Sequence, residues 1–390
     1  MGKPEIRFKG YTDEWEQRKL GDVAQEFKSG NSLKADEIDI TGDYPVYGGN
    51  GLRGYTSTYN HDGEYALIGR QGALCGNMNY SAGKAYFTEH AVVVKADENN
   101  VTRFLYYMLD TMNLGQYSDQ SAQPGLAVNK LVKLENSFPK KEEQQQIGAY
   151  FRSLDHLITL HQRKCDEVKS LKKYMLQKMF PQNEQKVPEI RFEGFTEAWE
   201  QRKLGDLVDR VTRKNQDLVS ELPLTISAQY GLIDQNEFFD KRVASKDVSG
   251  YYLIENGEFA YNKSTSTDAP WGAIKRLDRY ENGVLSTLYI VFGIKANNPI
   301  DSDFLVSYYS TNLWHKGIHE IAAEGARNHG LLNIAPADFF ETKLMIPQDI
   351  EEQKKIGKYF EELERLITLH QRKCEELQNI KKFMLQNMFV

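Results

Sequence analysis

The chain has 390 residues, of which 40% are hydrophobic and 27% are charged. This length and composition can bury two or more cores, which excludes a peptide, a disordered tail protein and a fibrous repeat. The sequence has no run of 18 apolar residues that could cross a bilayer, and its first ten residues lack the apolar stretch of a secretory signal. Three scattered cysteines, Cys75, Cys165 and Cys374, do not suit a disulfide framework or a zinc site built on CxxC pairs. We therefore expect a cytoplasmic protein in a reducing compartment.

The sequence repeats itself. Residues 4–23 (PEIRFKGYTDEWEQRKLGDV) return at 188–207 as PEIRFEGFTEAWEQRKLGDL, with 15 of 20 positions identical. Residues 142–180 return in the same way at 351–389. The stretches between these segments, 24–138 and 208–346, share no comparable run of residues. The chain thus alternates a constant frame with a variable insert, twice, and the order of segments predicts that its last residues lie near residue 4.

The second repeated segment predicts a long helix in each copy. It has no proline between Pro139 and Pro181 or after Pro347, and Leu, Lys, Gln, Glu and Met dominate it. Its apolar or small residues recur with gaps of three and four, as in a helix seam. A helix from about Glu143 to Met179 would be roughly 55 Å long, and the repeat makes the pair antiparallel. The predicted seam comprises Leu154, Ile158, His161, Cys165, Val168, Leu171, Met175 and Met179, and Leu363, Ile367, His370, Cys374, Leu377, Ile380, Met384 and Met388.

The inserts have the pattern of mixed strand and helix. In the first, we expect strands at 65–68 and 91–95 and a helix over 102–114; in the second, a strand over 285–294 and a helix over 303–313. The predicted fold class is α+β: two mixed α/β domains separated by two long antiparallel helices that form a coiled-coil spacer, with a pseudo-two-fold internal repeat.

The repeated pattern resembles that of a known family. Two copies of RFxG(Y/F)TxxWEQRKLGD are each followed by a divergent insert, a proline, EEQxxIGxYF, LxxLITLHQRKCxE and MLQxMF. This order is similar to that of specificity subunits of type I restriction-modification enzymes, and the resemblance spans the whole chain. It implies two target recognition domains that each read one half of a split DNA sequence, and a helical spacer that docks modification subunits.

The resemblance assigns the chain as follows: target recognition domain 1 at 1–141, a central spacer helix at 142–180, a linker at 181–187, target recognition domain 2 at 188–349, and a distal spacer helix at 350–390. It also implies a non-catalytic subunit. S-adenosylmethionine, ATP and Mg²⁺ would be bound by partner polypeptides and not by this chain. The expected partners are double-stranded DNA, two modification (methyltransferase) subunits and, as a further candidate, restriction (nuclease and translocase) subunits.

Motifs for catalysis by the chain itself are missing from the sequence. A methyltransferase would carry an Asn-Pro-Pro or Asp-Pro-Pro aromatic tetrapeptide, and Asn298-Pro299-Ile300 lacks the second proline and the aromatic residue. Gly83-Lys84-Ala85 does not match a P-loop. His315 and His319 lack the glutamate of HExxH, so we interpret them as packing or surface residues. Asp338, Glu341 and Lys343 are too closely spaced for the usual strand-borne acidic cluster of a metal nuclease.

Candidate DNA contacts lie on glycine-rich loops of the inserts. Arg and Lys read guanine, Asn and Gln read adenine, and Ser, Thr, Tyr and Lys commonly hold phosphates. Arg70 and Gln71, flanked by Gly69 and Gly72, are the foremost candidates, although polar turns without a ligand are the competing interpretation for each residue. In the first insert the candidates are Tyr47, Asn50, Arg53, Tyr55, Thr56, Arg70, Gln71, Asn77, Asn79, Ser121, Gln123 and Asn129. In the second they are Ser227, Gln229, Tyr230, Asn262, Lys263, Ser264, Trp271, Lys275, Arg276, Arg327, Asn328 and His329, with a core role for Trp271 equally open.

The charge of the inserts does not favour strong non-specific DNA binding. Residues 20–138 hold nine basic and fourteen acidic side chains, and residues 204–346 hold fourteen and nineteen. Each insert is thus near −5, so we expect weak binding by the chain alone, with partner subunits clamping the duplex. The alternative function is a coiled-coil scaffold with two lobes that bind protein partners. A metal at the repeated His161, Cys165, His370 and Cys374 is disfavoured, because small or polar seam residues usually set packing.

Overall fold

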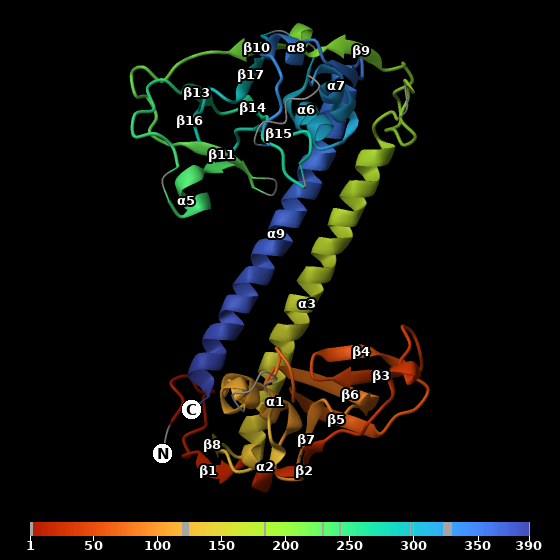
Figure 1. The fold of residues 1–390 in the computed structure, drawn as a ribbon, viewed down its shortest axis with the longest axis vertical. Coiled ribbons are helices and arrows are strands. Elements are labelled where there is room, and N and C mark those ends of the chain that lie inside the picture. Colours follow the sequence, from red (N-terminus) through yellow and green to blue (C-terminus); the bar gives the residue numbers. More distant parts are fainter. Residues whose placement is uncertain are drawn as a thin grey trace. The chain divides into compact units, whose positions relative to one another are not determined.

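The computed structural model describes residues 3–118, 125–182, 185–227, 230–241, 243–267, 269–296, 298, 300–322 and 330–389. The chain divides into two compact units: unit 1 is Met1–Arg163 with His370–Val390, and unit 2 is Lys164–Leu369. Figure 1 labels most of their helices and strands. The fold is α+β: each unit combines a mixed α/β domain with segments of two long helices, α3 (Lys141–Lys178) and α9 (Ile350–Met388).

Unit 1 is built on a six-stranded sheet of order β2-β7-β5-β6-β3-β4, in which only the β3–β6 pairing is parallel among the described strands. A separate ribbon pairs β1 with β8. The elements are β1 (Glu16–Lys19), η1 (Leu20–Val23), β2 (Ala24–Ser29), η2 (Ala35–Glu37), β3 (Tyr44–Gly48), β4 (Gly51–Thr56), β5 (His61–Gly69), β6 (Met78–Phe87), β7 (Ala91–Ala96), α1 (Thr102–Thr111), η3 (Leu114–Tyr117), α2 (Val128–Leu131) and β8 (Glu135–Phe138), where η marks a 3₁₀ helix.

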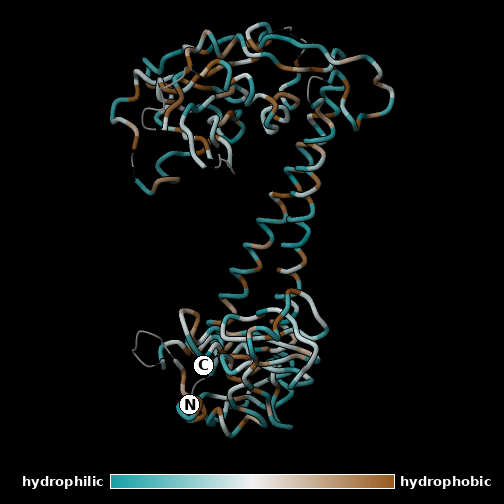
Figure 2. Tube along the Cα trace, turned by 45° about the vertical axis from the view of Figure 1, so that its right-hand side comes forward, coloured by the Kyte–Doolittle hydropathy of each residue, from teal (hydrophilic) through white to brown (hydrophobic). Residues whose placement is uncertain are grey.

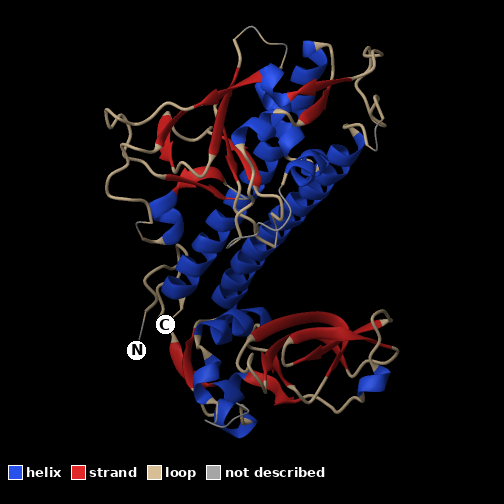
Figure 3. Ribbon diagram, turned by 45° about the horizontal axis from the view of Figure 1, so that its top comes forward, coloured by secondary structure: helices blue, strands red, loops and turns tan. Residues whose placement is uncertain are grey.

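Unit 2 has a four-stranded sheet of order β10-β17-β14-β15 and the two-stranded pairs β11-β12, β13-β16 and β18-β9. In Figure 3 the strands of each unit gather into sheets, with helices beside them. The elements are β9 (Glu200–Lys203), α4 (Leu204–Leu207), β10 (Val208–Val211), β11 (Leu224–Ser227), β12 (Gly231–Asp234), α5 (Gln235–Phe239), β13 (Tyr252–Glu255), β14 (Phe259–Asn262), β15 (Ala273–Arg276), β16 (Asn282–Leu285), β17 (Ile290–Ile294), α6 (Ser302–Tyr309), α7 (Leu313–Ile321), α8 (Pro336–Phe340) and β18 (Lys343–Ile346).

The expected elements form, with one correction in the first insert and two in the second. The helix predicted over 102–114 is α1, which ends at Thr111 and is followed by the separate η3. The predicted strand over 285–294 is two strands, β16 and β17, because a turn closed by the hydrogen bond from Tyr289 N–H to Ser286 O (3.1 Å) interrupts it. The predicted helix over 303–313 is α6, which ends at Tyr309 and is followed by the separate α7. The shared order of strand then helix is confirmed, as β7–α1 in the first insert and β17–α6 in the second.

The two long helices run antiparallel within each unit, as the repeat predicts. In unit 1, Asp155 of α3 pairs with Lys381 of α9 (2.6 Å) and His161 meets His370 further along. In unit 2, Lys172 of α3 pairs with Glu364 of α9. Hydrophilic and hydrophobic residues alternate along both helices (Figure 2). The first turn of each helix contains acidic residues, such as Glu142 in α3. The positive end of the helix dipole stabilises a negative charge at this position.

In both units, the end of a long helix makes the same backbone contact with the repeated segment that begins PEIRF. In unit 1, the backbone N–H of Ile6 donates to the carbonyl oxygen of Asn387 (2.9 Å). In unit 2, the N–H of Ile190, 184 positions later, donates to the carbonyl oxygen of Lys178 (2.9 Å). The expected meeting of the last residues of the chain with its first segment is thereby confirmed.

One buried ion pair anchors each frame segment to the start of a long helix. Arg7 donates from Nε and Nη2 to Glu143 of α3 (2.7 and 2.8 Å), and Arg191 donates in the same way to Glu352 of α9 (2.6 and 2.8 Å). Each glutamate side chain is only 1% exposed. The hydrogen bonds to Glu143 raise the pKa of Arg7, and those to Glu352 raise the pKa of Arg191. Such bidentate pairs fix the orientation as well as the distance of their partners.

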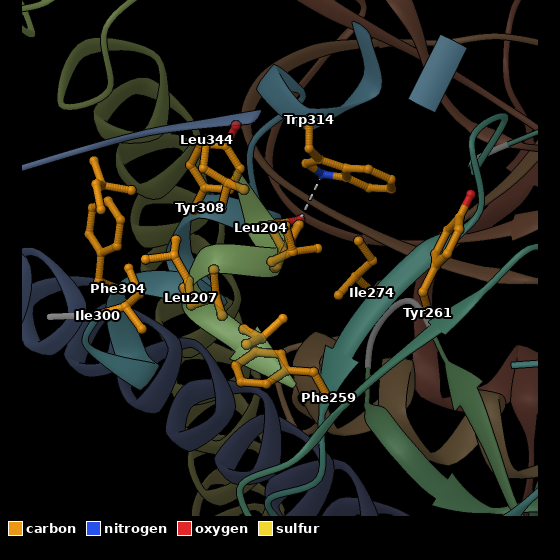
Figure 4. Packing of buried hydrophobic residues seen from close by; sticks show 14 of the residues in the cluster. Leu204, Leu207, Phe259, Tyr261, Ile274, Ile300, Phe304, Tyr308, Trp314 and Leu344 are labelled. Atoms are coloured by element: carbon orange, nitrogen blue, oxygen red, sulfur yellow. Dashed lines mark hydrogen bonds between the residues drawn. The ribbon is translucent and has the colours of Figure 1, made fainter. Parts of the chain in front are cut away.

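Aromatic rings from the frame complete the core of each unit. Phe389, after the end of α9, packs against Phe104 of α1 with ring centroids 5.4 Å apart. Phe180, after the end of α3, packs against Phe304 of α6 at 5.7 Å. Figure 4 shows part of the unit 2 core, where the Nε1–H of Trp314 donates to the carbonyl oxygen of Tyr309 (3.2 Å). The constant frame therefore supplies part of the core on which each unlike insert folds.

The seam between the helices differs in part from the predicted stripe. Eight seam residues are buried: Leu154, Cys165, Met179, Leu363, Ile367, Cys374, Leu377 and Met388. Ile158, His161, Val168, Met175, His370 and Met384 are partly buried. The prediction was wrong for Leu171 and Ile380, which are each 44% exposed. The sequence period placed these two on the seam, but each helix has a wider apolar face than its partner covers.

Candidate nucleic-acid interface

Three loops of unit 1 meet around a cavity of about 290 Å³. They are the turn between β3 and β4, the loop after β5, and the loop between β6 and β7. The lining residues are Gly49, Asn50, Arg53, Gln71 and His90. Three of these, Asn50, Arg53 and Gln71, are among the residues that the sequence predicts as DNA contacts. The structure therefore brings together side chains from separate segments of the first insert.

Backbone hydrogen bonds hold the three loops in contact. The N–H of Arg70 donates to the carbonyl oxygen of His90 (2.9 Å), and the N–H of Thr88 donates to that of Tyr47 (2.9 Å). The turn approaches so closely that a Cβ added to Gly69 would lie 2.4 Å from the carbonyl oxygen of Gly49. The glycine at position 69 is thus required by the close approach of two backbones.

Basic and amide groups dominate this cavity. Asn50, Arg53 and Gln71 are exposed, and no ion pair between described residues involves Arg53. Arg70 is half-buried, and its Nη1 donates to the carbonyl oxygen of Glu89 (3.3 Å). The amides and guanidinium groups are the types that read base edges and hold phosphates. The side chains of the cavity can therefore form several hydrogen bonds with a ligand whose edge carries polar oxygen or nitrogen atoms.

His90 is a lining residue that sequence reasoning missed. Its Nδ1 lies 3.0 Å from Oε1 of Gln71, and its Nε2 lies 3.5 Å from Oε1 of Glu89. The only signal in the sequence was its place in a short loop before the buried strand 91–95. That signal is weak, because a lone histidine between strands is compatible with many roles.

The other candidates of the first insert divide between surface and packing positions. Asn77 and Asn129 are exposed, while Asn79 and Tyr55 are half-buried. Tyr47 packs edge-on against Phe87 with centroids 6.0 Å apart. Thr56 is 5% exposed, so its side chain is part of the core. Ser121 and Gln123 lie outside the described residues.

The cysteine of the first insert lies near these loops. Cys75 is half-buried, and its Sγ–H donates to the carbonyl oxygen of Arg70 (3.3 Å). Burial raises the pKa of its thiol.

The described candidates of the second insert are more dispersed. Tyr230 is exposed, whereas Ser227 is buried. Asn262 donates to the hydroxyl of Tyr289 (3.3 Å) and accepts from the N–H of Ser264 (3.0 Å). Trp271 is half-buried and packs edge-on against His319, so it combines core contact with partial exposure. Gln229, Arg327, Asn328 and His329 lie outside the described residues.

The basic candidates of the second insert are held by the fold. Arg276 forms ion pairs with Asp278 (2.6 Å) and Asp303 (2.7 Å). Burial lowers the pKa of Lys263, whose Nζ donates to the carbonyl oxygen of Ile334 (3.4 Å). Burial, with the nearby charge of Lys172, also lowers the pKa of Lys275. These three residues are therefore less available for a ligand than Arg53.

No group of three or more His, Cys, Asp or Glu side chains within the described part of the chain could hold a metal ion. Cys165 and Cys374 instead direct Sγ toward a backbone carbonyl oxygen of the opposite helix, Ile367 and Ile158 respectively, each at 4.0 Å. Over the same residues, no helix is long and apolar enough to span a membrane.

Comparison with known proteins identifies the family. The profile described as "Type I restriction modification DNA specificity domain" matches residues 12–170 and 196–379. The chain belongs to this family. Its two matched segments correspond to the two copies of the repeat, so this specificity chain carries the domain twice.

Relatives of this specificity chain include two curated proteins and a solved structure. It is 42% identical over 156 residues to the EcoprrI type I restriction enzyme specificity subunit of Escherichia coli, and 27% identical over 150 residues to a putative type I restriction enzyme specificity subunit of Haemophilus influenzae. These alignments span 39% and 38% of this chain and the same shares of the two relatives, so the match covers about two fifths of each. The crystal structure of the type I restriction-modification S subunit from M. genitalium has a TM-score of 0.71 at 15% identity, covering 100% of this chain and 99% of that one. This likeness shows the fold of a specificity subunit.

Proposed function

We propose that the chain is the non-catalytic subunit that selects the DNA sequence for a type I restriction-modification complex, with each insert reading one half of a bipartite target. The observation that carries this proposal is a contrast: the frame makes the same contacts in both units, whereas the two inserts form different sheets. The Arg7–Glu143 and Arg191–Glu352 pairs recur, whereas one insert has a six-stranded sheet and the other a four-stranded one. Equivalent frames with different readers suit recognition of two different short sequences.

The cavity of unit 1 supports the assignment of DNA as ligand. Arg53, Asn50 and Gln71 can hydrogen-bond to base edges, and the cavity they line is open to solvent. Most phosphate contacts position a protein on DNA without reading sequence. Because the inserts are acidic overall, we propose that partner subunits supply most of these contacts.

Exposed apolar residues on the long helices support docking of two modification subunits. Unit 1 exposes Leu157 and Leu160 of α3 and Ile380 and Phe383 of α9. Unit 2 exposes Leu369 of α9 and Leu171 and Tyr174 of α3, with Leu366 half-buried. The two sets occupy equivalent positions of the repeat. Since exposed apolar patches mark interaction sites, two like sets favour two copies of one partner.

Catalysis is assigned to those partners in this proposal. Methyl transfer would use S-adenosylmethionine on the modification subunits, and cleavage would use ATP and Mg²⁺ on restriction subunits, should these join the complex. A cytoplasmic location completes the proposal, because chromosomal DNA is the ligand and the three cysteines are free thiols.

Exchange of one insert tests the proposal. The full chain and a variant whose residues 24–138 are replaced by the first insert of another family member would each be expressed with the modification subunits, and methylated adenines in host DNA would be mapped. We expect one half of the methylated sequence to change while the other half and the spacing are retained. Methylation unaffected by the exchange would overturn the proposal.

A coiled-coil scaffold with two partner-binding lobes is the competing function, which the exposed apolar sets would also suit. Replacing Arg70, Gln71, Arg327 and Asn328 with alanine separates the two. A scaffold would assemble with its partners as before and show no change in any DNA readout. A specificity subunit would assemble equally well but lose sequence selection in methylation.

A further inference from the structure

We propose that His90 is a positioning residue that fixes the side-chain amide of Gln71 to read an adenine in the first half-site. This inference rests on the proposed function, because it assigns a specificity role within the same interface. It starts from a chain of three polar side chains at the cavity, Glu89, His90 and Gln71. Nδ1 of His90 lies 3.0 Å from Oε1 of Gln71, and Nε2 lies 3.5 Å from Oε1 of Glu89.

The loop that carries His90 is held on both sides. The N–H of Glu89 donates to the carbonyl oxygen of Asn31 (3.1 Å), and the N–H of Ala91 donates to that of Thr88 (3.0 Å). The carbonyl oxygen of His90 accepts from the N–H of Arg70 (2.9 Å). The imidazole therefore projects from a backbone with little freedom, beside the residue that it contacts. A side chain on such a fixed segment loses little conformational freedom when a ligand binds.

The loop that carries Gln71 is fixed in a similar way. Gln71 forms an isolated β-bridge with Gly125, and the carbonyl oxygen of Arg70 accepts from the N–H of Leu126 (2.9 Å). A Cβ added to Gly49 would lie 3.0 Å from the carbonyl oxygen of His90 and 3.4 Å from that of Gln71. The backbone of the β3–β4 turn thus packs on both loops. The Gln71 side chain is exposed, so without a partner its amide could rotate.

The hydrogen bond to His90 removes that freedom at the amide. A glutamine amide that turns by 180° exchanges its donor and acceptor, and would present either to a base edge. Because an amide oxygen can only accept, the 3.0 Å contact with Oε1 requires the ring proton on Nδ1 of His90. In that tautomer the amide presents one face: Oε1 keeps a second lone pair, and Nε2 keeps its N–H groups. This donor and acceptor pair matches N7 and the N6 amino group of adenine in the major groove. The geometry therefore favours adenine at the base pair that Gln71 meets.

A second Glu–His–amide chain in the same unit provides a matched control. Nε2 of His61 lies 2.9 Å from Oε1 of Glu26, and its Nδ1 lies 2.7 Å from Oδ1 of Asn60. His61 is 8% exposed and stacks on Phe87 with centroids 4.7 Å apart. It does not line the cavity. Removal of His61 therefore deletes the same chemistry from the core and not from the proposed reading surface.

The test measures base selection with the full chain assembled with its modification subunits. A pool of duplexes with a randomised first half-site and a fixed second half-site would be methylated, and the preference at each base pair would be read from the methylated fraction. The variants are Gln71→Ala, His90→Ala, His90→Asn and His61→Ala. Asparagine at position 90 can place an N–H donor near the site of Nδ1, so it serves as the conservative replacement.

We expect Gln71→Ala to reduce the preference for adenine at one base pair by roughly ten- to a hundred-fold. His90→Ala should relax the same base pair several-fold, and His90→Asn should restore part of that loss. His61→Ala should lower thermal stability and total methylation without altering the pattern of base preference. In a second pool, with the second half-site randomised and the first one fixed, all four substitutions should leave the base preferences of the second half-site unchanged.

Two results would overturn the inference in distinguishable ways. If Gln71→Ala relaxes one base pair but His90→Ala leaves that preference intact, or changes a different base pair, His90 does not position Gln71, while the proposed function stands. If Gln71→Ala changes no preference, Gln71 does not read a base, and the inference fails with it. Exchange of the whole insert then decides whether the first insert reads DNA at all.

Discussion

His161 on α3 and His370 on α9 face each other with their Nδ1 atoms 3.0 Å apart, although 209 residues separate them in the chain. Their ring centroids are 5.2 Å apart. The two residues occupy equivalent positions of the repeat. Two equivalent positions can meet in this way only if the helices run antiparallel with the register centred on them. The histidine pair therefore fixes the antiparallel register of α3 and α9 in unit 1.

Removal of this pair should reveal coupling between the two rings. His161→Leu leaves the His370 ring beside an apolar side chain, while the double variant with His370→Leu gives an apolar pair. We expect each single substitution to lower the free energy of unfolding by about 1 kcal/mol, and the double variant to lose less than the sum, with a coupling of about 1 kcal/mol. Urea unfolding followed by helical circular dichroism measures both quantities. Strictly additive losses would show that the rings do not interact.

The long helices and the frame could be predicted from the sequence, because the repeat displays each pattern twice. Pro139 and Pro347 stand just before α3 and α9, and the spacing of apolar residues predicted the buried Cys165 and Cys374. The same spacing was wrong for Leu171 and Ile380, which are exposed. Periodicity shows which residues share a face of a helix, but the partner helix decides how much of that face is covered.

The candidate interface could be predicted only in part. The glycines around Arg70 and Gln71 indicated a close backbone approach, and the structure places Gly69 against Gly49. His90 could not be found in this way, because the pairing of β5 with β7 brings it beside Gln71, which lies 19 positions earlier in the chain. Such contacts depend on the lengths of the strands and loops, and no local sequence motif determines these lengths.

The buried Arg7–Glu143 pair should matter strongly for the stability of unit 1. Arg7→Met leaves the carboxylate of Glu143, which is 1% exposed, without its bidentate partner. We expect a loss of about 3 kcal/mol in the free energy of unfolding of this unit, because an uncompensated buried charge is costly. Hydrogen exchange with mass spectrometry would detect faster exchange in β1, β8 and the start of α3.

Two further variants control that prediction. Arg191→Met, in the equivalent pair with Glu352, should produce the same loss in unit 2 and leave exchange in unit 1 unchanged. Lys140→Met removes an exposed ion pair with Asp13 and should have little effect, since such pairs contribute little. A comparable loss in the Lys140 variant would contradict the assigned importance of burial.

The stability of unit 2 should depend on pH through His315. Burial against Trp314 lowers the pKa of His315 from its ordinary value of 6.5. As the pH falls below 6.5, the unfolded chain takes up a proton before the folded one does, so folding stability declines until the folded ring is protonated as well. His315→Phe should flatten this decline. Thermal unfolding of both proteins between pH 7.5 and 5, roughly the range in which histidine titrates, measures the difference. Parallel curves would refute the assignment.

DNA binding by the isolated chain should be weak. Each insert carries about five more acidic than basic residues, so few counterions are released when the chain meets a duplex. In mobility-shift assays at near-physiological salt, we expect no stable complex with the chain alone and a sequence-specific complex once the modification subunits are added. A non-specific duplex of equal length is the control. Tight, salt-sensitive binding by the chain alone would contradict the expectation.

The exposed apolar residues of the helices should determine how many modification subunits bind. Phe383→Asp places a charge in the apolar set of unit 1, and Tyr174→Asp does the same at the equivalent position of unit 2. Since a carboxylate buried in an apolar interface is strongly unfavourable, each single variant should retain one modification subunit and the double variant none. Native mass spectrometry of the purified complex counts the copies. Asn99→Asp adds the same charge to an exposed loop between β7 and α1 and should leave both copies bound. Two copies on the double variant would show that docking uses another surface.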